Sequence, residues 1–452
     1  MSAIGVTVIA GLLVIPPVAA LTRLRPVAAV SLIIGMVCFS AHLLALVYSA
    51  GLPAWLVRGL IPVKDWVSLA TAITLILSRP HRVRESRWPF VVLLVTVAVG
   101  CLVTLIRSSH VSLDALFSSA RSLMVAPIGI AIALWLSKGE RERVRRYGAV
   151  LIAIGAAWGL IEYVLPWSVV THLFAVGRYW ADVKGQRPYL VNIPGVGLLP
   201  GNFTTNPYVA GATRRLAGPF GDPLTAGVLC AVGLVWGLAS FAKARVLGVL
   251  SLISGLALLL TLTRAGWLLA AASIIPMVAA EAFRSFHGSV RKTSVFIGAT
   301  VTVLAAIVVV LPVTRTYLVS VFSGRNSSTS GHLAALAQLG HHDYTLLGGG
   351  VGSAGAVVEM GTESSAITVV LQLGLLGGAL YLGACVALLA KRRQHWEPEV
   401  VQFLLLLTLL LSWFSSEEWL TYNAGLPTAL FVALGGSLAR PWRRLDARDL
   451  SS

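Results

Sequence analysis

The sequence contains little charge for its length. Only 12% of its 452 residues are Asp, Glu, Lys or Arg, whereas 57% are hydrophobic. A soluble globular chain carries roughly 25% charged residues, and one with so few would have too little polar material to cover a surface in contact with water. This scarcity excludes a soluble multidomain protein, which is what the length alone would suggest.

Cysteine and the motifs of nucleotide enzymes are also scarce or missing. The four cysteines all lie inside apolar runs and lack the spacing of a metal site, so we expect buried, inert thiols; they are Cys38, Cys101, Cys230 and Cys385. No Walker A loop, dinucleotide fingerprint or Gly-x-Ser-x-Gly elbow occurs in a supporting context. ATP hydrolysis by this chain is therefore not expected.

Long apolar runs dominate the chain. A membrane-spanning helix needs about 20 apolar residues, and thirteen stretches are candidates. They lie near 5–22, 27–49, 62–78, 89–106, 119–137, 148–165, 219–241, 246–263, 265–283, 294–313, 363–390, 401–414 and 425–439. We therefore predict an all-α, polytopic integral membrane protein, a single membrane domain over 1–452 with about 12–13 transmembrane helices; twelve remain possible if 62–78, 401–414 or the first run is re-entrant. The first run lacks a basic start, so a cleaved signal peptide is not expected.

Basic residues gather in every second hydrophilic gap, although the net charge of +17 alone would suggest a nucleic-acid partner. The basic gaps lie at 23–25, 79–87, 138–146, 243–245, 284–292, 391–393 and 440–448. This alternation follows the positive-inside rule and places these gaps and the C-terminus in the cytoplasm, with the N-terminus outside if all thirteen runs span. Attraction to anionic membrane lipid is a secondary consequence, and no nucleic acid is expected as a partner.

Two long segments, 166–218 and 314–362, fall on the opposite, extracytoplasmic side. Loops longer than about 15 residues are usually functional or disordered. The first is rich in aromatic residues, namely Trp167, Tyr179, Trp180, Tyr189 and Tyr208; the second contains the stretch 323–331 and the glycine run 348–355. Such aromatic residues suit stacking on sugar rings, and they suit equally a position in the membrane interface.

Arg264 lies in a turn of two or three residues between the eighth and ninth apolar runs. An Arg at a helix centre costs about 2.5–3.5 kcal/mol on insertion scales. The side chain either extends to the outer interface as an anchor or points into a cavity where it binds an anion.

Arg214 and Arg215 precede the seventh run. Asp222 and Pro223 match an N-terminal helix cap and a first-turn proline. A helix N-terminus with two arginines before it is a candidate phosphate site. The alternative is a capped helix with ordinary interfacial arginines.

The second long segment offers further ionisable side chains. Its histidines and aspartate match no common zinc spacing, so no metal site is expected; they are His332, His341, His342 and Asp343. Glu363 opens the eleventh run, where partial burial would raise its pKa toward neutrality and suit it to act as a base. A favourable interaction with the helix dipole also explains a Glu there.

Three more acidic residues lie near the outer ends of apolar runs. They are Glu162, at the end of the sixth run, and Glu417 and Glu418, between the last two. Either group could pair with the arginines, and we interpret them as counter-ions rather than catalysts.

Three spaced elements resemble the O-antigen ligase and polymerase family of bacterial membrane glycosyltransferases. They are Arg215-Leu-Ala-Gly-Pro-Phe-Gly-Asp-Pro, then Leu-Thr-Arg264-Ala-Gly, then a large outer loop that runs from Gly324-Arg325 through Leu347-Gly-Gly-Gly-Val-Gly to Glu363-Ser-Ser and Gln372-Leu-Gly-Leu-Leu-Gly. The resemblance spans about 215–378. It implies a substrate held by a polyprenyl diphosphate at the outer face of the bacterial cytoplasmic membrane. Arg215, Arg264 and Arg325, with Arg214 beside them, would then bind the diphosphate.

The chain departs from this family at two positions. Ligases often carry a His, commonly His-Asn, where this sequence has Glu363 and Ser364, and many members have an aromatic residue at the position of His332. These departures weaken a ligase interpretation and leave Glu363 as the candidate base.

We therefore expect a metal-independent polymerase, without cofactor, that joins polyprenyl-diphosphate-linked oligosaccharide units to an acceptor glycan. The alternatives are a ligase that transfers the glycan to a lipid or cell-wall acceptor, and a transporter or flippase. The resemblance also implies a flippase and chain-length regulators as partners. A transporter usually shows paired halves and broken helices near the midplane, and neither is visible in the sequence.

Overall fold

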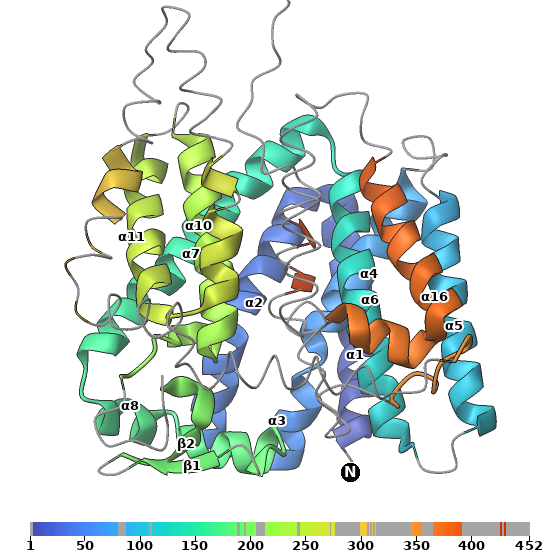
Figure 1. The fold of residues 1–452 in the computed structure, drawn as a ribbon, viewed down its shortest axis with the longest axis horizontal. Helices are drawn as coiled ribbons and strands as arrows, with labels where there is room; N and C mark the ends of the chain where they lie inside the picture. The colour runs from blue at the N-terminus through green and yellow to red at the C-terminus, as the bar shows by residue number, and fades with distance from the viewer. Residues whose placement is uncertain are drawn as a thin grey trace, which may run out of the picture.

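The computed structural model describes most of the first 275 residues and parts of the remainder. The described residues are 3–79, 87–107, 111–187, 190–193, 196–204, 213–241, 245–271, 273–275, 299–304, 307, 310, 312, 345–353, 365–390, 425–426 and 429–430. Within them the protein is a bundle of helices with one two-stranded sheet (Figure 1).

Seven helical stretches in the described part of the chain are long and apolar enough to cross a membrane. They are Gly5–Leu24 in α1, Pro26–Ser49 (α2), Ala54–Ser78 over α3 and α4, Trp88–Ile106 in α5, Ala115–Trp135 in α6, Gly139–Val164 in α7 and Ser365–Leu388 in α16. Shorter apolar helices are Pro223–Leu238 in α10, Arg245–Thr261 (α11) and Arg264–Ile275. This agrees with the expected all-α architecture of a multi-pass membrane protein.

Apolar side chains cover much of the outside of the bundle. Leu12 and Leu13 on α1 (Ala3–Leu24) and Leu105 and Ile106 on α5 (Arg87–Arg107) are each more than half exposed. Contiguous exposed apolar surface is rare on a soluble monomer. It is the surface that lipid chains cover in a membrane protein.

The helix α7 (Lys138–Val164) begins well before the apolar run 148–165 that predicted it. Ser137 caps it: its hydroxyl accepts from the Glu140 N–H at 3.3 Å, while the Glu140 carboxylate accepts from the Ser137 N–H at 2.7 Å. This reciprocal capping box satisfies two backbone donors and starts the helix inside the basic segment. Hydropathy alone could not place that start.

Successive long helices run in opposite directions, so the described basic segments gather at one end of the bundle. The end of α1, the end of α4 (Val63–Ser78) and the start of α7 lie together at the top of Figure 1. Arg79 joins two of them through a bidentate pair with Glu140, at 2.7 and 2.8 Å. We call this the basic end.

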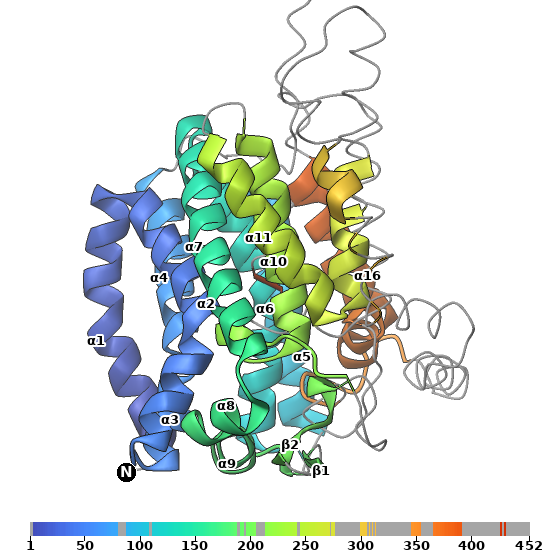
Figure 2. The same cartoon turned by 90° about the vertical axis from the view of Figure 1, so that its left-hand side faces the viewer.

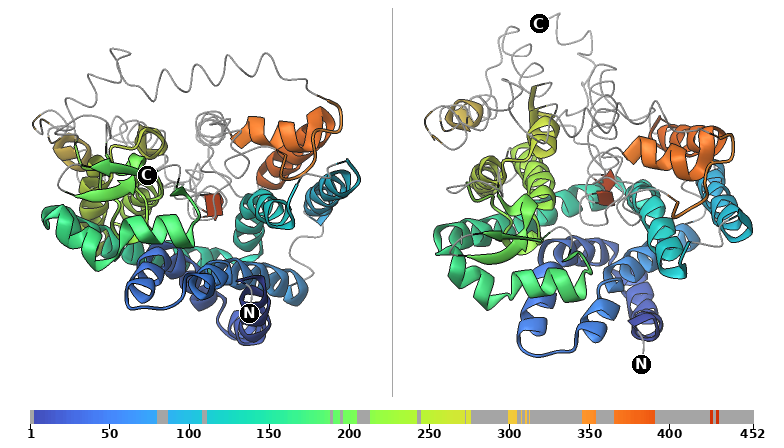
Figure 3. Two further views of the ribbon diagram at one scale, coloured as in Figure 1. Left: turned by 90° about the horizontal axis from the view of Figure 1, so that it is seen from below. Right: turned by 60° about the horizontal axis from the view of Figure 1, so that its bottom comes forward.

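The opposite end carries a small folded unit where the sequence predicted a loop. Its elements are α8 (Trp167–Leu173), α9 (Val176–Arg178), a π-helical turn (Tyr179–Val183), β1 (Leu190–Ile193), β2 (Gly197–Pro200) and a 3-10 turn (Gly201–Phe203). The strands pair antiparallel, with Leu190 opposite Pro200 and Ile193 opposite Gly197. We call the described residues of 167–204 the lid. It lies at the bottom of the bundle in Figure 2, and Figure 3 shows that it lies away from α5 and α16.

A hydrophobic cluster of its own attaches the lid to α2 and α3 (Ala54–Leu60). Tyr179, Trp180 and Phe203 are at most 8% exposed there and pack with Ala45 of α2 and Val57 of α3. Burying each large aromatic side chain contributes about 1.5–3 kcal/mol. Tyr179 and Trp180 therefore pack inside the protein rather than in an exposed interfacial belt; Tyr189 and Tyr208 lie outside the described residues.

The glycine run 348–353 packs against a break in α16 (Ser365–Ala390). Gly374 has φ 78°, a left-handed conformation that interrupts the helix. The N–H groups of Gly349 and Gly350 donate to the carbonyls of Leu371 and Gln372, which the break leaves available, at 2.9 and 3.0 Å. The run is thus part of the helix packing, and glycine is required because backbone approaches backbone.

Candidate functional site

Arg214 and Arg215 lie in a short extended segment that connects the lid to α10 (Pro223–Ser240). The N–H of Arg215 donates to Phe203 O, and the N–H of Leu216 donates to Leu260 O, both at 2.9 Å. Successive side chains of an extended segment point to opposite sides. The two adjacent arginines therefore reach different partners.

Arg215 connects the lid to the end of α11 (Arg245–Thr261). Its Nε donates to Thr261 O at 2.9 Å, its Nη1 to Asn202 O at 3.0 Å and its Nη2 to Thr263 Oγ1 at 3.1 Å. The planar fork of a guanidinium can serve all three acceptors at once. The sequence predicted a diphosphate ligand here, and in the structure these three donor groups bind the protein itself.

The turn before Arg264 has the predicted length. The helix α11 ends at Thr261, and the next helix begins at Arg264. Leu262 adopts a left-handed conformation with φ 50°, which costs a residue other than glycine about 1–2 kcal/mol. Thr263 helps to hold the turn in this conformation, because its hydroxyl donates to Pro223 O at 2.9 Å.

Two glycines let this turn approach the first turns of α10. A Cβ on Gly266 would lie 2.6 Å from the backbone of Gly227, and a Cβ on Gly227 would lie 2.6 Å from the Cβ of Thr263. Both distances are far below van der Waals contact. The half-buried Arg264 is thereby placed beside the N-terminal part of α10.

The N-terminus of α10 is capped as the sequence predicted. Asp222 is the N-cap, and its carboxylate accepts from the Thr225 N–H at 2.8 Å and from the Thr225 hydroxyl at 2.7 Å, with Pro223 in the first turn. The aspartate thus occupies the position at which an anion would bind the N–H groups of this helix. A phosphate here would meet a carboxylate.

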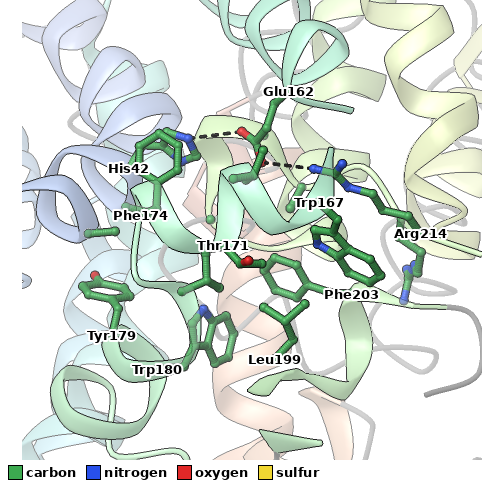
Figure 4. Close-up of a pocket in the computed structure, with 18 residues that line it drawn as sticks. His42, Glu162, Trp167, Thr171, Phe174, Tyr179, Trp180, Leu199, Phe203 and Arg214 are labelled. Atoms are coloured by element: carbon green, nitrogen blue, oxygen red, sulfur yellow. Dashed lines mark ion pairs between the residues drawn. The ribbon is translucent and has the colours of Figure 1, made fainter. Parts of the chain in front are cut away.

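Arg214 belongs to a line of three polar side chains from three parts of the chain, which we call the polar row. His42 of α2 lies with Nε2 3.1 Å from Glu162 Oε2, and Arg214 Nη2 lies 3.9 Å from Glu162 Oε1 (Figure 4). Glu162 stands near the end of α7 and is only 7% exposed. The pairing of Glu162 with an arginine that the sequence suggested is present for Arg214.

Arg214 is also held by neutral groups. Its Nη1 donates to Leu165 O at 2.9 Å, and its guanidinium lies 5.5 Å from the ring centre of Trp167 and 5.7 Å from that of Tyr163. Burial lowers the pKa of Arg214, and the nearby Glu162 carboxylate opposes that shift. An arginine remains charged despite such a shift, so it carries a fixed positive charge into the site.

Glu162 and His42 have hydrogen-bonding capacity that the described residues do not use. The Glu162 Oε2 and His42 Nε2 atoms are buried without a partner of hydrogen-bonding geometry, although they lie 3.1 Å apart. The 3.9 Å between Glu162 Oε1 and Arg214 is too long for a direct hydrogen bond. Buried polar atoms are normally satisfied.

A cavity beneath the lid is bordered by this polar row. Aromatic rings form much of its wall, contributed by Trp167, Phe174, Tyr179, Trp180 and Phe203 (Figure 4). The empty volume is about 540 Å³, part of which is open to solvent. Ligand sites typically combine such apolar walls with a few polar groups; Arg215 also lines the cavity, and Arg264 is not among the described lining residues.

Polar contacts to α2 and α3 hold the lid over this cavity. The Tyr48 hydroxyl donates to Asp182 Oδ2 at 2.7 Å. Arg58 donates from Nη2 to Asp182 O at 2.6 Å and from Nε to Val183 O at 3.0 Å. The bond from Tyr48, followed by the exposed pair with Arg187, lowers the pKa of Asp182, which therefore stays ionised at neutral pH.

Lys184 follows the π-helical turn and covers one face of Trp180. Its Nζ lies 3.5 Å from the ring centre of Trp180, within the range of a cation–π contact. Burial lowers the pKa of Lys184 to about 8, and Asp222 opposes this shift. The lid therefore contains an amine that holds its proton less tightly than an exposed lysine does.

A second pair of opposite charges lies within the bundle. Asp65 in the first turn of α4 and Arg121 on α6 (Leu113–Trp135) approach to 3.1 Å. Charged side chains between membrane helices are rare and usually functional. No group of three or more potential metal-binding side chains occurs among the described residues.

Several predicted site residues lie outside the described residues. These are the candidate base Glu363, the arginine Arg325, the histidines His332, His341 and His342, and the acidic residues Asp343, Glu417 and Glu418. Of the arginines that the structure does describe, Arg215 binds the turn before Arg264, whereas Arg214 faces Glu162.

His42, Tyr48 and Asp182 were missed in the sequence. No local pattern marks His42, which is a lone histidine in an apolar helix, and its partner Glu162 is distant in sequence. The acidic Asp182 in a weakly charged loop was the one available signal for the lid contacts.

Comparisons of the chain with protein-family models, curated proteins and solved structures found no match.

Proposed function

We propose that this protein is a membrane glycosyltransferase that joins oligosaccharide units carried on a polyprenyl diphosphate. The observation that supports this proposal is that basic, acidic and aromatic side chains lie together at the lid end of the bundle. Arg214, Arg215, Glu162 and His42 come together there with five aromatic rings under one cover. Hydroxyl binding and stacking on a sugar ring require polar and aromatic side chains of these kinds, and Arg215 links the lid to the turn before Arg264, to which we assign the diphosphate.

The lid end faces the outside of the cytoplasmic membrane in this proposal. The basic end then lies in the cytoplasm, as the positive-inside rule requires. The chain would cross the membrane twelve or thirteen times, with its C-terminus inside and with 166–218 and 314–362 outside. Lipid-linked sugars are then available without any nucleotide sugar.

The reaction needs three tasks from the chain. An acceptor hydroxyl attacks the anomeric carbon of the donor sugar, its proton passes to a base, and the bond from that carbon to the diphosphate oxygen breaks. The products are a new glycosidic bond and a free polyprenyl diphosphate. We assign the base to Glu363. We assign to Arg264, which Arg215 helps to position, and to Arg325 the stabilisation of the charge on the leaving diphosphate, which fixed positive groups can provide in a site of low dielectric constant.

Purified, reconstituted protein tests the proposal directly. It would be given a polyprenyl-diphosphate-linked oligosaccharide, and the glycan products would be sized on a gel. We expect a ladder of longer glycans and release of polyprenyl diphosphate in equal amount. Release without longer glycans, in the presence of a lipid or cell-wall acceptor that becomes glycosylated, would favour the ligase instead.

A transporter is the second candidate, and the ion pair between Asp65 and Arg121 favours it. Charges between membrane helices often mark a translocation path. The same liposomes distinguish the two functions. Movement of the lipid-linked glycan across the bilayer without any new glycosidic bond would identify a transporter and would overturn the transferase.

A further inference from the structure

The charges of the polar row disfavour an anion in the cavity beneath the lid. Arg214 is the guanidinium of the row, and the Glu162 carboxylate lies 3.9 Å from it. An ionised phosphate carries only acceptor oxygens, so it could bind Arg214 but would repel Glu162. A neutral ligand avoids this conflict.

The spacing between the two charged groups suits a bridging hydroxyl. A polar contact longer than about 3.5 Å is one that an intervening oxygen can bridge. A hydroxyl both donates and accepts hydrogen bonds, so a single one can donate to Glu162 Oε1 while it accepts from Arg214 Nη2. Both bonds involve a charged partner, and such bonds are roughly twice as strong as neutral ones.

The buried atoms next to this gap indicate the same kind of ligand. Glu162 Oε2 and His42 Nε2 lie 3.1 Å apart, but neither atom has a partner of hydrogen-bonding geometry among the described residues. A carboxylate accepts a hydrogen bond from a ligand hydroxyl, and a histidine ring nitrogen can either donate to a hydroxyl or accept from one. A ligand with several neighbouring hydroxyls matches this arrangement.

The aromatic wall accounts for the rest of the ligand. Trp167, Phe174 and Trp180 line the cavity together with Leu199 of the lid strand β2. Aromatic rings offer broad apolar faces, and sites for small molecules combine such faces with a few fixed polar groups. The C–H face of a pyranose ring is apolar, whereas its rim carries hydroxyls.

We propose that the cavity beneath the lid binds one neutral pyranose ring of the glycan, with a sugar hydroxyl bridging Glu162 and Arg214 and the C–H face of the ring against the aromatic wall. This assignment rests on the proposed function for its biological substrate. The proposal gives different roles to the two arginines that are adjacent in sequence. Arg214 recognises sugar, whereas Arg215 holds the lid to the turn before Arg264.

Calorimetric titration of the purified full-length protein in detergent tests this site without any turnover. The probes are a panel of methyl pyranosides of hexoses, deoxyhexoses and N-acetylhexosamines, with inorganic pyrophosphate as the competing anion. We expect saturable binding of at least one glycoside, which pyrophosphate does not displace. Glu162→Gln and Arg214→Gln should each weaken it about tenfold or more, the effect of losing one hydrogen bond to a charged group.

Matched variants separate recognition from folding. Glu142→Gln makes the same change at the other end of α7, where Glu142 pairs with Arg146, and it should leave glycoside binding unchanged. Trp167→Leu removes a half-buried ring of the wall and should weaken binding, whereas Trp88→Leu, on an exposed ring of α5, should not. A variant that unfolds at the same temperature as the wild type is taken to be folded. If a polar-row variant does not fold, Trp167→Leu and its control Trp88→Leu still test the cavity.

Three results would overturn the sugar site: no glycoside binds saturably, pyrophosphate displaces the bound glycoside, or Glu162→Gln and Trp167→Leu both bind like the wild type. These results are independent of the transfer assay. If the protein transfers glycan but binds no glycoside in the titration, only the proposed sugar site is wrong. If it binds a glycoside but transfers no glycan, only the proposed reaction is wrong.

Discussion

Arg215 donates a hydrogen bond from Nη2 to the hydroxyl of Thr263 at 3.1 Å, and that hydroxyl in turn donates to Pro223 O at 2.9 Å. One oxygen thus joins the segment after the lid, the turn after α11 and the start of α10. The next residue is Arg264. The position of Arg264 is therefore fixed by groups that are far apart in the sequence, which is what a preorganised cation requires.

Replacing Thr263 by Val should loosen this junction while keeping its shape. The change leaves Pro223 O and Arg215 Nη2 without their partner, which we expect to cost about 1–3 kcal/mol of unfolding free energy. Transfer should fall as well, because Arg264 would be less well positioned. Thermal unfolding and kcat/KM for transfer measure the two effects.

Controls for Thr263 are available within the chain. Thr263→Ser keeps the hydroxyl and should restore both properties. Thr71→Val alters a buried threonine whose hydroxyl donates within its own helix, to Val67 O at 2.8 Å, and it should have little effect. Equal stability and transfer in Thr263→Val and the wild type would show that the junction is unimportant.

Arg264→Ala should lower kcat/KM for transfer by about 10²-fold or more, the usual effect of removing a group that stabilises transition-state charge. The control is Arg187→Ala in the lid. Arg187 is largely exposed and pairs with Asp182 at 3.0 Å, and such surface pairs contribute about 0–1 kcal/mol. Full activity of the Arg264 variant would count heavily against a diphosphate site at this turn.

Glu363→Gln should reduce turnover by about 10²–10⁴-fold, because a carboxylate base would be lost. Binding of the lipid-linked substrate should be retained, since the amide is isosteric. Single-turnover kinetics and a lipid-binding assay separate the two quantities. Unchanged turnover would remove Glu363 as the base.

Lys184 gives the lid a pH dependence with a definite sign. Its pKa is lowered to about 8 by burial, below the value of about 10.4 of an unfolded chain. The unfolded state therefore binds more protons between these values, so the contribution of Lys184 to stability rises with pH in this window. Lys184→Met removes the charge that burial disfavours.

Thermal unfolding of the two proteins from pH 7 to pH 10 measures this effect. We expect Lys184→Met to be the more stable at pH 7, with the difference shrinking as the pH rises past about 8. A difference that does not change with pH would show that Lys184 does not titrate in the lid.

Much of the bundle could be predicted from sequence because its helices are specified locally. Long apolar runs, the Asp222 cap and the short turn at Thr263 depend on residues close together in the chain. The lid could not be predicted in this way. Its aromatic residues pack on α2 and α3, and Asp182 binds Tyr48 more than a hundred residues away, so no local pattern distinguishes them from a loop of interfacial aromatics.

The candidate site was predicted in part for the same reason. The arginines and Glu162 stand out because charge is rare in apolar sequence, and Arg214 does pair with Glu162. The partners of Arg215 are mostly backbone carbonyls, which every residue has, so its role in holding the lid leaves no trace in sequence. His42 acquires significance only when α2 and α7 lie side by side.

A structure of the protein with a polyprenyl diphosphate bound would show whether Arg264 binds the leaving group. We expect the diphosphate within hydrogen-bonding distance of the Arg264 guanidinium, at the lid end of the bundle and outside the cavity bordered by Glu162. A diphosphate at the basic end, or an Arg264 side chain that points into lipid headgroups with no diphosphate beside it, would rule out this role of Arg264.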